Sequence, residues 1–432
     1  MAVPQAGSRA SAQTGARRHS VFHPLRVGGI ERLTDDAVAI TFDVPPELRE
    51  QFRFRAGQHV SIRSPVVGDD VRRNYSICAP AAGGEQRLRI GVKRIPDGVF
   101  SSYVAEHLRP GDLLDIMTPT GTFSTALRPG QRKRYGAIAA GSGITPVLSI
   151  LSTALEVEPE SSAVLVYVNR TTLDIMFLED LEDLKNRFPD RFQLIHVLDE
   201  EPLDVEILSG RLDADRLGRI LDHLVLPDDV DEWFLCGPLP MTDAAREVLL
   251  GYGAADQHIH RELFFVGPPP TAARPAAQNQ AEPETGASVT VLLDGRSQTF
   301  VLAEDGASIL DATLRYRADA PFACKNGVCG TCRAKVVDGA VRMDANYALE
   351  PADVAAGYAL ACQSHPAADR VVLDFDQLPN LRIGLVTALV AGQPTWHSSP
   401  MGGWRGRLRT NVQGGISATP VVLLLGLTNL RA

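Results

Sequence analysis

The spacing of four cysteines constrains this chain more than any other feature of its sequence. Cys324, Cys329 and Cys332 lie in one short loop that contains glycine, and Cys362 follows after twenty-nine residues. This spacing is the ligand pattern of a plant-type 2Fe-2S cluster, and thiolate sulfur is the soft ligand that iron requires. The pattern predicts metal ligands rather than a disulfide framework, which indicates a reducing compartment, with the cytoplasm as the default.

Structural zinc is the alternative for the same cysteines. Zinc sites prefer paired Cys-x2-Cys knuckles, and only Cys329 and Cys332 have that spacing. Gly327 and Gly330 also favour a cluster, because glycine lets backbone N–H groups approach the sulfurs without a Cβ atom in the way. The two remaining cysteines stand alone and are expected not to be ligands: Cys78 and Cys236.

The length and the hydrophobic pattern of the chain predict three folded domains. A chain of 432 residues that is 44% hydrophobic is too long for one ordinary core. Residues 21–128 alternate short apolar runs with turns, which predicts an antiparallel β-barrel. Residues 133–266 alternate apolar runs with helical patterns, which predicts an α/β domain with a parallel sheet. Residues 287–377 combine strand-like runs, a helical run and the cysteine loop in a compact α+β domain.

Three further segments are expected to lie outside these domains. Residues 267–286 are rich in Pro and Ala without a hydrophobic period, which predicts a linker. Residues 1–20 are rich in Ala, Ser and Arg, so they could mimic a transit peptide, although a disordered tail is favoured. Residues 378–432 contain no Asp, Glu or Lys and receive no predicted fold. A disordered appendage and a membrane-surface segment both remain open for them.

Charge and hydropathy exclude two classes of function. The formal net charge of -9 argues against a nucleic-acid partner. No apolar run approaches the ~18 residues that a membrane-spanning helix needs, so no transmembrane segment is expected.

A strand of the predicted barrel carries the segment RRNYSIC, which contains Arg73, Tyr75 and Ser76. A 2Fe-2S cluster carries one electron, so a hydride donor would require a converter such as flavin. An arginine can pair with a phosphate, a tyrosine ring can lie against an isoalloxazine, and a serine hydroxyl can hydrogen-bond near it. Taken alone, the same pattern is often a solvated strand face. A second segment would suit a pyrophosphate at a helix N-terminus through Gly98, Ser101 and Ser102.

Two segments of the predicted α/β domain point to a nucleotide. The strand YGAIAA runs into Gly141, Gly143 and Pro146, where glycine permits close approach to a phosphate and proline begins a helix. Cys236, followed by Gly237 and Pro238, comes at the carboxyl end of a strand, where ligands of parallel sheets bind. The alternative for this thiol is a buried core residue.

Taken in order, these segments resemble the ferredoxin-NADP reductase superfamily with a C-terminal plant-type ferredoxin of β-grasp fold, over roughly residues 20–376. The resemblance is strongest to reductase subunits of the phenylacetyl-CoA epoxygenase type, which act in phenylacetate catabolism. It is carried by these stretches: FHPLRV, DVRRNYSIC, GVFSSYV, AAGSGITPVLSI, YVNRTTLDIMF, CGPLPM and CKNGVCGTCRAKV.

The resemblance implies roles for individual residues. FAD would be bound by Arg73, Tyr75 and Ser76, with Ser76 close to the flavin N5 atom, and its pyrophosphate by Gly98, Ser101 and Ser102. NAD(P)H would be positioned by Gly141, Gly143, Thr145, Cys236, Gly237 and Pro238. An acidic residue and an aromatic residue near the flavin would be Glu262 and Phe264, although RELFF could equally be an ordinary strand end.

Arg170 follows a predicted strand at the point where a cation could meet a 2′-phosphate. We therefore expect NADPH rather than NADH, with an ordinary surface arginine as the alternative. The ten histidines are expected to have no catalytic role, and three of them are taken as surface or hydrogen-bonded structural residues: His23, His59 and His107.

The expected activity is electron transfer from NADPH through FAD and the 2Fe-2S cluster to an oxygenase, with Ser76 and Cys236 as the residues nearest the chemistry. The resemblance implies a di-iron oxygenase that acts on phenylacetyl-CoA. Another oxygenase, such as a ring-hydroxylating one, is the alternative partner. A non-enzymatic redox sensor is a further alternative, which complete flavin and nucleotide motifs make less favoured.

Overall fold

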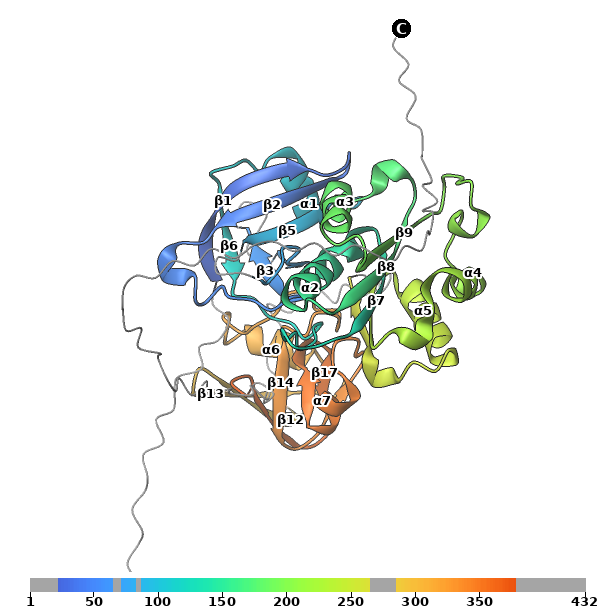
Figure 1. Cartoon of the computed structure of the whole chain (residues 1–432). Helices are drawn as coiled ribbons and strands as arrows, with labels where there is room; N and C mark the ends of the chain where they lie inside the picture. The colour runs from blue at the N-terminus through green and yellow to red at the C-terminus, as the bar shows by residue number, and fades with distance from the viewer. Residues whose placement is uncertain (1–21, 65–70, 83–86, 265–284, 378–432) are drawn as a thin grey trace, which may run out of the picture. The chain divides into compact units, whose positions relative to one another are not determined.

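The computed structural model describes residues 22–64, 71–82, 87–264 and 285–377 (Figure 1). The described residues all fall within one compact unit of the chain and form three large sheets. The predicted N-terminal tail, most of the predicted linker and the predicted C-terminal tail lie outside the described residues.

The first sheet is antiparallel and closes on itself. Its strand order is β4-β3-β6-β1-β2-β5, and a bridge between Ile77 and Ile90 joins the two edge strands. Val60, Ile62 and Ile116 are fully buried inside it, as alternating apolar residues predict. The elements are β1 (Phe22–Arg32), β2 (Ala37–Asp43), η1 (Pro46–Leu48), β3 (His59–Arg63), β4 (Arg72–Ser76), β5 (Leu88–Lys93), α1 (Val99–Glu106) and β6 (Leu113–Met117).

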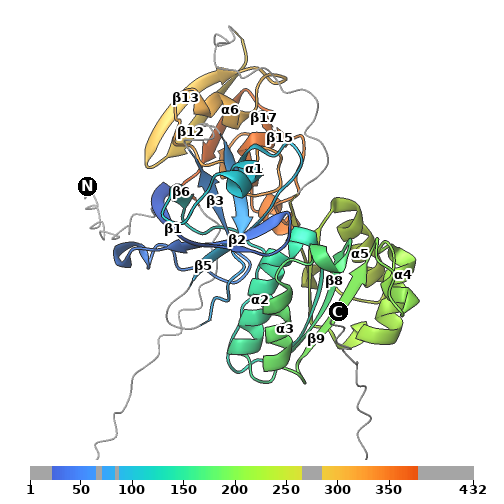
Figure 2. The ribbon, with the colours of Figure 1, turned by 90° about the horizontal axis from the view of Figure 1, so that it is seen from above.

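The second sheet is parallel, with the order β11-β10-β7-β8-β9, and helices cover both of its faces. Helices α2 and α3 lie on one face and α4 and α5 on the other (Figure 2). Its strands are β7 (Arg134–Ala140), β8 (Ser162–Asn169), β9 (Phe192–Leu198), β10 (Glu232–Gly237) and β11 (Ile259–Leu263).

The helices of this domain include several short turns. The α-helices are α2 (Ile144–Val157), α3 (Leu178–Arg187), α4 (Ala214–Ile220) and α5 (Leu239–Gly251). The short helices are η2 (Gly141–Gly143), η3 (Thr172–Asp174), η4 (Glu206–Leu208), η5 (Leu221–Val225), η6 (Pro227–Asp229) and η7 (Asp256–His258). Helix α2 is buried along most of its length, because it packs between the parallel sheet and the barrel.

The third sheet is mixed, with the order β13-β12-β18-β14-β16, and its central pair β12·β18 is parallel. Strands β15 and β17 form a separate two-stranded sheet. The elements are β12 (Ala287–Leu293), β13 (Arg296–Leu302), α6 (Ile309–Leu314), β14 (Arg333–Asp338), β15 (Val341–Met343), α7 (Pro351–Ala355), β16 (Tyr358–Leu360), η8 (Ala361–Gln363), β17 (Ser364–Pro366) and β18 (Arg370–Asp374).

These three architectures confirm the predicted fold class of a barrel, a parallel α/β domain and a small α+β domain. The predicted helical run ASILDATLRY forms the shorter helix α6, which begins only after Ser308, whose side chain accepts a hydrogen bond from the Asp311 N–H as an N-cap. None of the helices among the described residues is long and apolar enough to cross a membrane.

Candidate functional site

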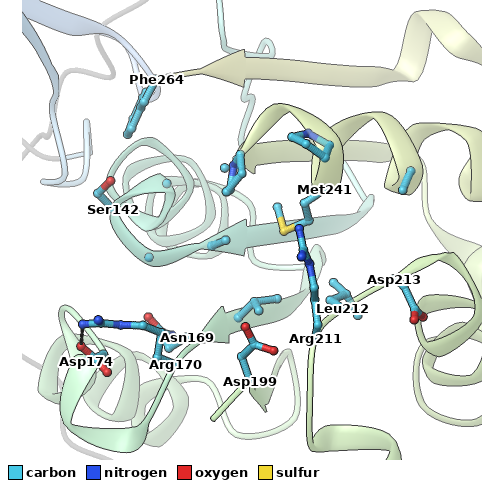
Figure 3. A pocket seen from close by; sticks show the side chains of 18 of the residues that line it. Ser142, Asn169, Arg170, Asp174, Asp199, Arg211, Leu212, Asp213, Met241 and Phe264 are labelled. Carbon is cyan, nitrogen blue, oxygen red and sulfur yellow. Dashed lines mark hydrogen bonds and ion pairs between the residues drawn. The ribbon is translucent and has the colours of Figure 1, made fainter. Parts of the chain in front are cut away.

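A cavity of about 640 Å³ lies at the carboxyl edge of the parallel sheet (Figure 3). Its lining includes residues at or just beyond the carboxyl ends of all five strands, which is where ligands of open α/β sheets bind. Six residues that the sequence assigned to a nucleotide or a flavin line it: Gly141, Gly143, Arg170, Gly237, Pro238 and Phe264.

The two glycines after β7 have different physical roles. A Cβ atom on Gly143 would lie 2.2 Å from the Cys236 carbonyl oxygen, so this glycine lets the loop pack against β10. Gly141 has a positive φ of 51°, and a Cβ atom there would meet nothing within 4 Å. The Tyr167 hydroxyl donates a hydrogen bond to the Gly141 carbonyl oxygen at 2.9 Å and fixes the loop. The first glycine therefore faces open space in the cavity, and the second makes room for protein backbone.

Thr145 and Cys236 are not among the residues that line this cavity. Thr145 is buried, and its hydroxyl donates to the Ser142 carbonyl oxygen at 3.0 Å. Cys236 is fully buried on β10. Their direct contact with a nucleotide therefore stays a prediction, and Thr145 shapes the glycine loop from inside.

Arg170 lines the cavity but is already paired. Its guanidinium forms an ion pair with Asp174, and Asp36 of the barrel lies 3.8 Å away. The hydrogen bond to Asp174, and then the charges of nearby carboxylates, raise the pKa of Arg170. The cation that the sequence assigned to a 2′-phosphate is thus compensated by protein carboxylates.

Ser76, Glu262 and Cys236 come together from two domains. The Ser76 hydroxyl at the end of β4 donates a hydrogen bond to Glu262 Oε2 at 3.0 Å. Glu262 on β11 is in register with Cys236 on the adjacent strand β10. His59 Nδ1 lies 3.9 Å from Glu262 Oε1, and its Nε2 is 3.3 Å from the Thr120 hydroxyl. His59 is therefore a buried, hydrogen-bonded residue, one of the two roles expected for it.

Burial controls the charges of this group. It raises the pKa of Glu262 from 4.5 to about 7, and the hydrogen bond from Ser76 offsets only part of the effect. Burial also lowers the pKa of His59 to about 4 and, together with the Glu262 charge, raises the pKa of the Cys236 thiol. Near neutrality the histidine and the thiol are uncharged, so Glu262 is the member of the group that titrates.

Strand β4 presents the remaining residues predicted to bind flavin. Arg73 and Tyr75 are two positions apart and lie on the same face of the strand. Arg73 is exposed, and its guanidinium donates to the Arg72 carbonyl oxygen at 2.8 Å. The Tyr75 ring is half-buried, with its centroid 5.6 Å from that of Phe100 on α1. The exposed guanidinium could pair with a phosphate, and the aromatic ring, which packs against Phe100, could lie against a planar ring system.

The second predicted flavin segment begins helix α1. Gly98 is the N-cap, and no side chain caps the helix. The Ser101 hydroxyl is buried and donates to the Gly98 carbonyl oxygen at 3.2 Å, whereas Ser102 is half-buried. The two serines are therefore not equivalent. Ser101 closes the turn, and the uncapped N–H groups with Ser102 fit an anion better.

The four predicted cluster ligands face one another. The thiols of Cys324 and Cys329 are close enough to influence each other's ionisation, as are those of Cys332 and Cys362, and Cys329 also influences the pKa of Cys332. The Cys329 side chain lowers the pKa of Cys324 to about 6, which favours the thiolate that a metal ligand must be. Among the described residues, no three His, Cys, Asp or Glu side chains surround a single ion position. The fit to a cluster rests on the spacing and mutual contacts of the four thiols.

Backbone N–H groups point at the sulfurs, as the glycines in the loop predicted. Asn326 donates its N–H to the Cys324 sulfur at 3.3 Å, and Thr331 to the Cys329 sulfur at 3.5 Å. Gly327 and Gly330 have positive φ angles of 76° and 66°. The glycines thus turn the loop, while neighbouring residues supply the donors.

The opposite face of β4 contacts the cysteine loop. The buried Arg72 guanidinium lies 3.8 Å from the ring centroid of Phe322 and donates to the Ala318 carbonyl oxygen at 3.4 Å. The Asn74 amide donates to the Thr331 hydroxyl at 3.4 Å. One short strand therefore carries Arg73 and Tyr75, which are predicted to bind flavin, on one face and contacts the predicted cluster loop through Arg72 and Asn74 on the other.

Several residues of the site were missed by the sequence reasoning. They line the nucleotide cavity and are Lys93, Ser142, Asn169, Asp199, Arg211 and Met241. Asp199 and Asn169 could have been found from their positions at or just after strand ends. Lys93 and Arg211 carry no such signal, because they reach the cavity from the barrel and from a loop.

Comparisons with known proteins agree with this geometry. Three family models match the chain: an oxidoreductase FAD-binding domain over residues 24–125, an oxidoreductase NAD-binding domain over 137–247 and a 2Fe-2S iron-sulfur cluster binding domain over 291–367. One subunit of the 1,2-phenylacetyl-CoA epoxidase of Escherichia coli (strain K12) is 45% identical over 83% of this chain and 98% of its own. The ferredoxin reductase component of 3-ketosteroid-9-alpha-monooxygenase from Rhodococcus rhodochrous is 32% identical over 81% and 96%.

A solved structure shows the same fold. Phthalate dioxygenase reductase, a modular protein for electron transfer from pyridine nucleotides to a 2Fe-2S cluster, matches with a TM-score of 0.51 at 21% identity, covering 82% of this chain and 98% of its own. The sequence relatives cover most of both chains, and the three matched domains follow one another in the predicted order. The chain therefore belongs to the ferredoxin-NADP reductase type of oxygenase reductases, oxidoreductases that join FAD-binding, NAD-binding and 2Fe-2S domains.

Proposed function

We propose that this protein is the reductase component of a phenylacetyl-CoA epoxidase. It takes electrons from a nicotinamide nucleotide and delivers them to the oxygenase component. The observation that carries the proposal is the position of β4, which meets Glu262 beside the nucleotide cavity through Ser76 and the cysteine loop through Arg72. The Escherichia coli relative, 45% identical, supports the choice of phenylacetyl-CoA as the oxygenase substrate.

When bound, FAD supplies the conversion of a two-electron hydride into single electrons, and the 2Fe-2S cluster supplies a one-electron carrier. Arg73 and the start of α1, with Gly98 and Ser102, bind the FAD phosphates. Tyr75 positions the flavin ring, and Ser76 with Glu262 forms the polar contact beside it. Four thiolates hold the cluster: Cys324, Cys329, Cys332 and Cys362.

The nucleotide is held by the residues that line the cavity. The backbone at Gly141 would face the pyrophosphate, and Gly237 and Pro238 would border the nicotinamide. Phe264, which is 39% exposed and lines the cavity, would lie where the nicotinamide approaches the flavin. The surrounding residues position the two rings and restrict access of oxygen. Electron transfer between the cofactors requires little acid–base catalysis from the protein.

We also propose the domain limits 21–128, 133–266 and 287–377, with a linker at 267–286, and a cytoplasmic location. The spacing of the four cysteines, which suits metal ligands rather than disulfides, supports a reducing compartment.

An anaerobic absorbance titration of the purified protein with NADH and with NADPH tests the electron path. The flavin band and the broad cluster band should bleach in turn. If neither band bleaches, or if the flavin bleaches and the cluster does not, the electron path is wrong and a redox sensor becomes the better assignment.

Reconstitution then tests the partner. The reduced protein is combined with each of three oxygenase components, and the rate of product formation is measured. The rate should be higher with the phenylacetyl-CoA epoxidase oxygenase than with a ring-hydroxylating or a 3-ketosteroid oxygenase. Equal or better support of either of the other two would reject the assigned partner and keep the reductase assignment.

A further inference from the structure

The four predicted cluster ligands come from two separate segments of the third domain. Three of them share the loop that begins with Cys324, whereas Cys362 lies in η8, which follows β16. A cluster held by both segments needs them at a fixed separation. The residue after Cys362, Gln363, connects the two segments directly, and its role at a cluster rests on the ligand assignment made in the proposed function.

The amide of Gln363 reaches from η8 to the cysteine loop. Its Nε2 atom donates a hydrogen bond to the Lys325 carbonyl oxygen at 2.8 Å. The same nitrogen lies 3.2 Å from the Cys362 carbonyl oxygen and 3.7 Å from the Cys362 sulfur. An amide nitrogen carries two hydrogens, so one can be held by the loop while the other is directed at Cys362. The side chain thus joins the loop to the fourth ligand.

Further contacts hold Gln363 in this position. Its side chain is half-buried, and its carbonyl oxygen accepts a hydrogen bond from the Asp344 N–H at 2.8 Å. The stem of the side chain packs against Gly327, where an added Cβ atom would lie 3.1 Å from Gln363 Cγ and 3.2 Å from the Ala345 carbonyl oxygen. Backbone and stem are therefore both fixed, so the amide is directed at the loop rather than free in solvent.

The hydrogen bond to Lys325 acts on an unusual point of the loop. Lys325 has a positive φ of 55°, which is uncommon for a residue with a Cβ atom. Its side chain is held separately, because the ammonium group lies 3.0 Å from an Asp311 carboxylate oxygen. Gln363 holds the carbonyl group of the same residue, directly after the first ligand Cys324. The contact therefore supports the turn that brings the loop to the predicted cluster.

We propose that Gln363 is a positioning residue that ties Cys362 to the cysteine loop and raises the reduction potential of the cluster. Reduction adds negative charge to a cluster, and N–H groups directed at its sulfurs stabilise that charge. Backbone N–H groups donate to two sulfurs of the loop, and Gln363 adds a side-chain donor beside the sulfur of Cys362. A higher potential makes the cluster a better acceptor of electrons from the flavin.

An anaerobic redox titration of the full-length holoprotein with dithionite and mediators tests the proposal. The EPR signal of the reduced cluster is followed, so neither a nucleotide nor an oxygenase is needed. Gln363→Leu removes the donor and keeps a side chain of similar size. At a fixed solution potential, its ratio of reduced to oxidised cluster should be about three- to tenfold lower than in the unaltered protein. A tenfold change corresponds to about 59 mV in a one-electron couple.

Two further variants show whether the effect is electrostatic and local. Gln363→Glu keeps the shape, removes the donor and adds a negative charge, so the ratio of reduced to oxidised cluster should fall further than in Gln363→Leu. Gln298→Leu is the matched control, because the Gln298 amide also donates to a backbone carbonyl oxygen of the third domain, at 3.1 Å. Gln298 lies on β13, at the edge of the sheet opposite β16, and its replacement should leave the ratio unchanged.

Lys325→Gly separates support of the loop from the effect on the potential. Glycine readily adopts the φ of 55° found at this position, so the loop of this variant depends less on Gln363. In the otherwise unaltered protein, Gln363→Leu should shorten the half-life of the cluster absorbance in an iron chelator several-fold. In the Lys325→Gly background, it should change this half-life little and still lower the ratio of reduced to oxidised cluster. This background also provides the comparison if Gln363→Leu alone does not retain its cluster.

An unchanged ratio in Gln363→Leu, or an equal fall in Gln298→Leu, would overturn the proposal. A fall that disappears in the Lys325→Gly background would also overturn it, because Gln363 would then only support the loop. If the unaltered protein gives no EPR signal of a reduced 2Fe-2S cluster, the ligand assignment in the proposed function fails, and the role of Gln363 fails with it.

Discussion

The Ser76 hydroxyl donates a hydrogen bond to Glu262 Oε2 at 3.0 Å and so connects the barrel to the parallel α/β domain. The two residues are 186 positions apart in the sequence. Glu262 is only 14% exposed, and His59 lies on its other side. Residues of both domains therefore surround this carboxyl group and affect its pKa. Its ionisation is the first property of the site that can be tested.

Replacement of Glu262 by Gln should remove a pH dependence of stability. Burial raises the pKa of Glu262 from 4.5 in the unfolded chain to about 7, so between these values the folded protein holds a proton that the unfolded chain has released. Stability should therefore fall as the pH rises through this window, by on the order of 3 kcal/mol in total. Glu262→Gln has no proton to lose. Its thermal midpoint, relative to that of the unaltered protein, should therefore rise between pH 5 and pH 8.

The exposed Glu247 on α5 provides a matched control, because Glu247→Gln makes the same chemical change in the same domain. Its pH profile should parallel that of the unaltered protein. If the pH profile of Glu262→Gln also paralleled that of the unaltered protein, the carboxyl group would not titrate in this window. The raised pKa of Glu262 would then be wrong.

Gly143→Ala should destabilise the nucleotide domain. The added Cβ atom would lie 2.2 Å from the Cys236 carbonyl oxygen, so the loop after β7 would have to move away from β10. The expected cost is roughly 1 to 3 kcal/mol, with weaker binding of nucleotide, measured by thermal unfolding and calorimetry. Gly251→Ala, at the end of α5 where a Cβ atom meets nothing within 4 Å, should be neutral or slightly stabilising. A stable Gly143→Ala variant with full nucleotide affinity would contradict the tight packing.

Arg73→Ala should lose FAD and keep the cluster. The exposed guanidinium on β4 supplies the charge proposed to pair with the flavin phosphates, and Arg73 lies on the face of the strand opposite Arg72 and Asn74, which contact the cysteine loop. The measurement is the ratio of flavin to iron in the purified protein. Arg32→Ala, at an exposed arginine of the same barrel paired with Asp35, should leave the ratio unchanged. Full flavin content in Arg73→Ala would show that Arg73 does not hold FAD and would contradict the assignment of this strand to the flavin site.

Local motifs made most of the fold and of the candidate site predictable. Three of the four cysteines share one loop, and Arg73, Tyr75 and Ser76 share one short segment. Each of these two groups is a local chemical pattern that can be recognised with little tertiary information. The parallel sheet was also predictable, because its buried strands are continuous apolar runs such as residues 163–168. The barrel followed from short alternating runs bounded by turns.

What could not be predicted depends on long-range pairing. The sequence shows an arginine after a strand, but not that Arg170 is paired with Asp174 and bordered by Asp36. It shows a threonine in the glycine loop, but not that Thr145 turns inward. Asp199 follows a strand end, which the sequence shows, but only the register of β8 and β9 places it next to Asn169 at the cavity.

Cys362→Ser should abolish the cluster absorbance and leave the flavin in place. Cys362 is the one predicted ligand outside the loop, and its thiol influences the pKa of Cys332, so its loss should open one side of the predicted site. Iron content and the visible spectrum provide the measurement. Cys78→Ser is the control, because this buried thiol donates to the Arg89 carbonyl oxygen and a hydroxyl can replace it. Equal iron loss in both variants would indicate general misfolding rather than loss of a ligand.

Arg72→Ala should slow electron transfer to the cluster without slowing reduction of the flavin. The Arg72 guanidinium lies 3.8 Å from the ring centroid of Phe322, next to the cysteine loop, and such a buried contact is worth about 2 kcal/mol. Without it, the 2Fe-2S domain should spend less time against the barrel. Reduction of cytochrome c, used as an acceptor from the cluster, should fall several-fold, while reduction of ferricyanide, used as an acceptor from the flavin, should not change.

Arg63→Ala provides the matched control for this variant. The Arg63 guanidinium also lies over an aromatic ring, 4.6 Å from the centroid of Phe22, but both residues belong to the barrel. It should leave both rates unchanged. Phe322→Ala should reproduce the effect of Arg72→Ala, and the double variant should be no slower than either single one, because the two changes remove the same contact. A parallel fall of the cytochrome c and ferricyanide rates in Arg72→Ala would show that the residue supports the flavin site itself and not the approach of the cluster.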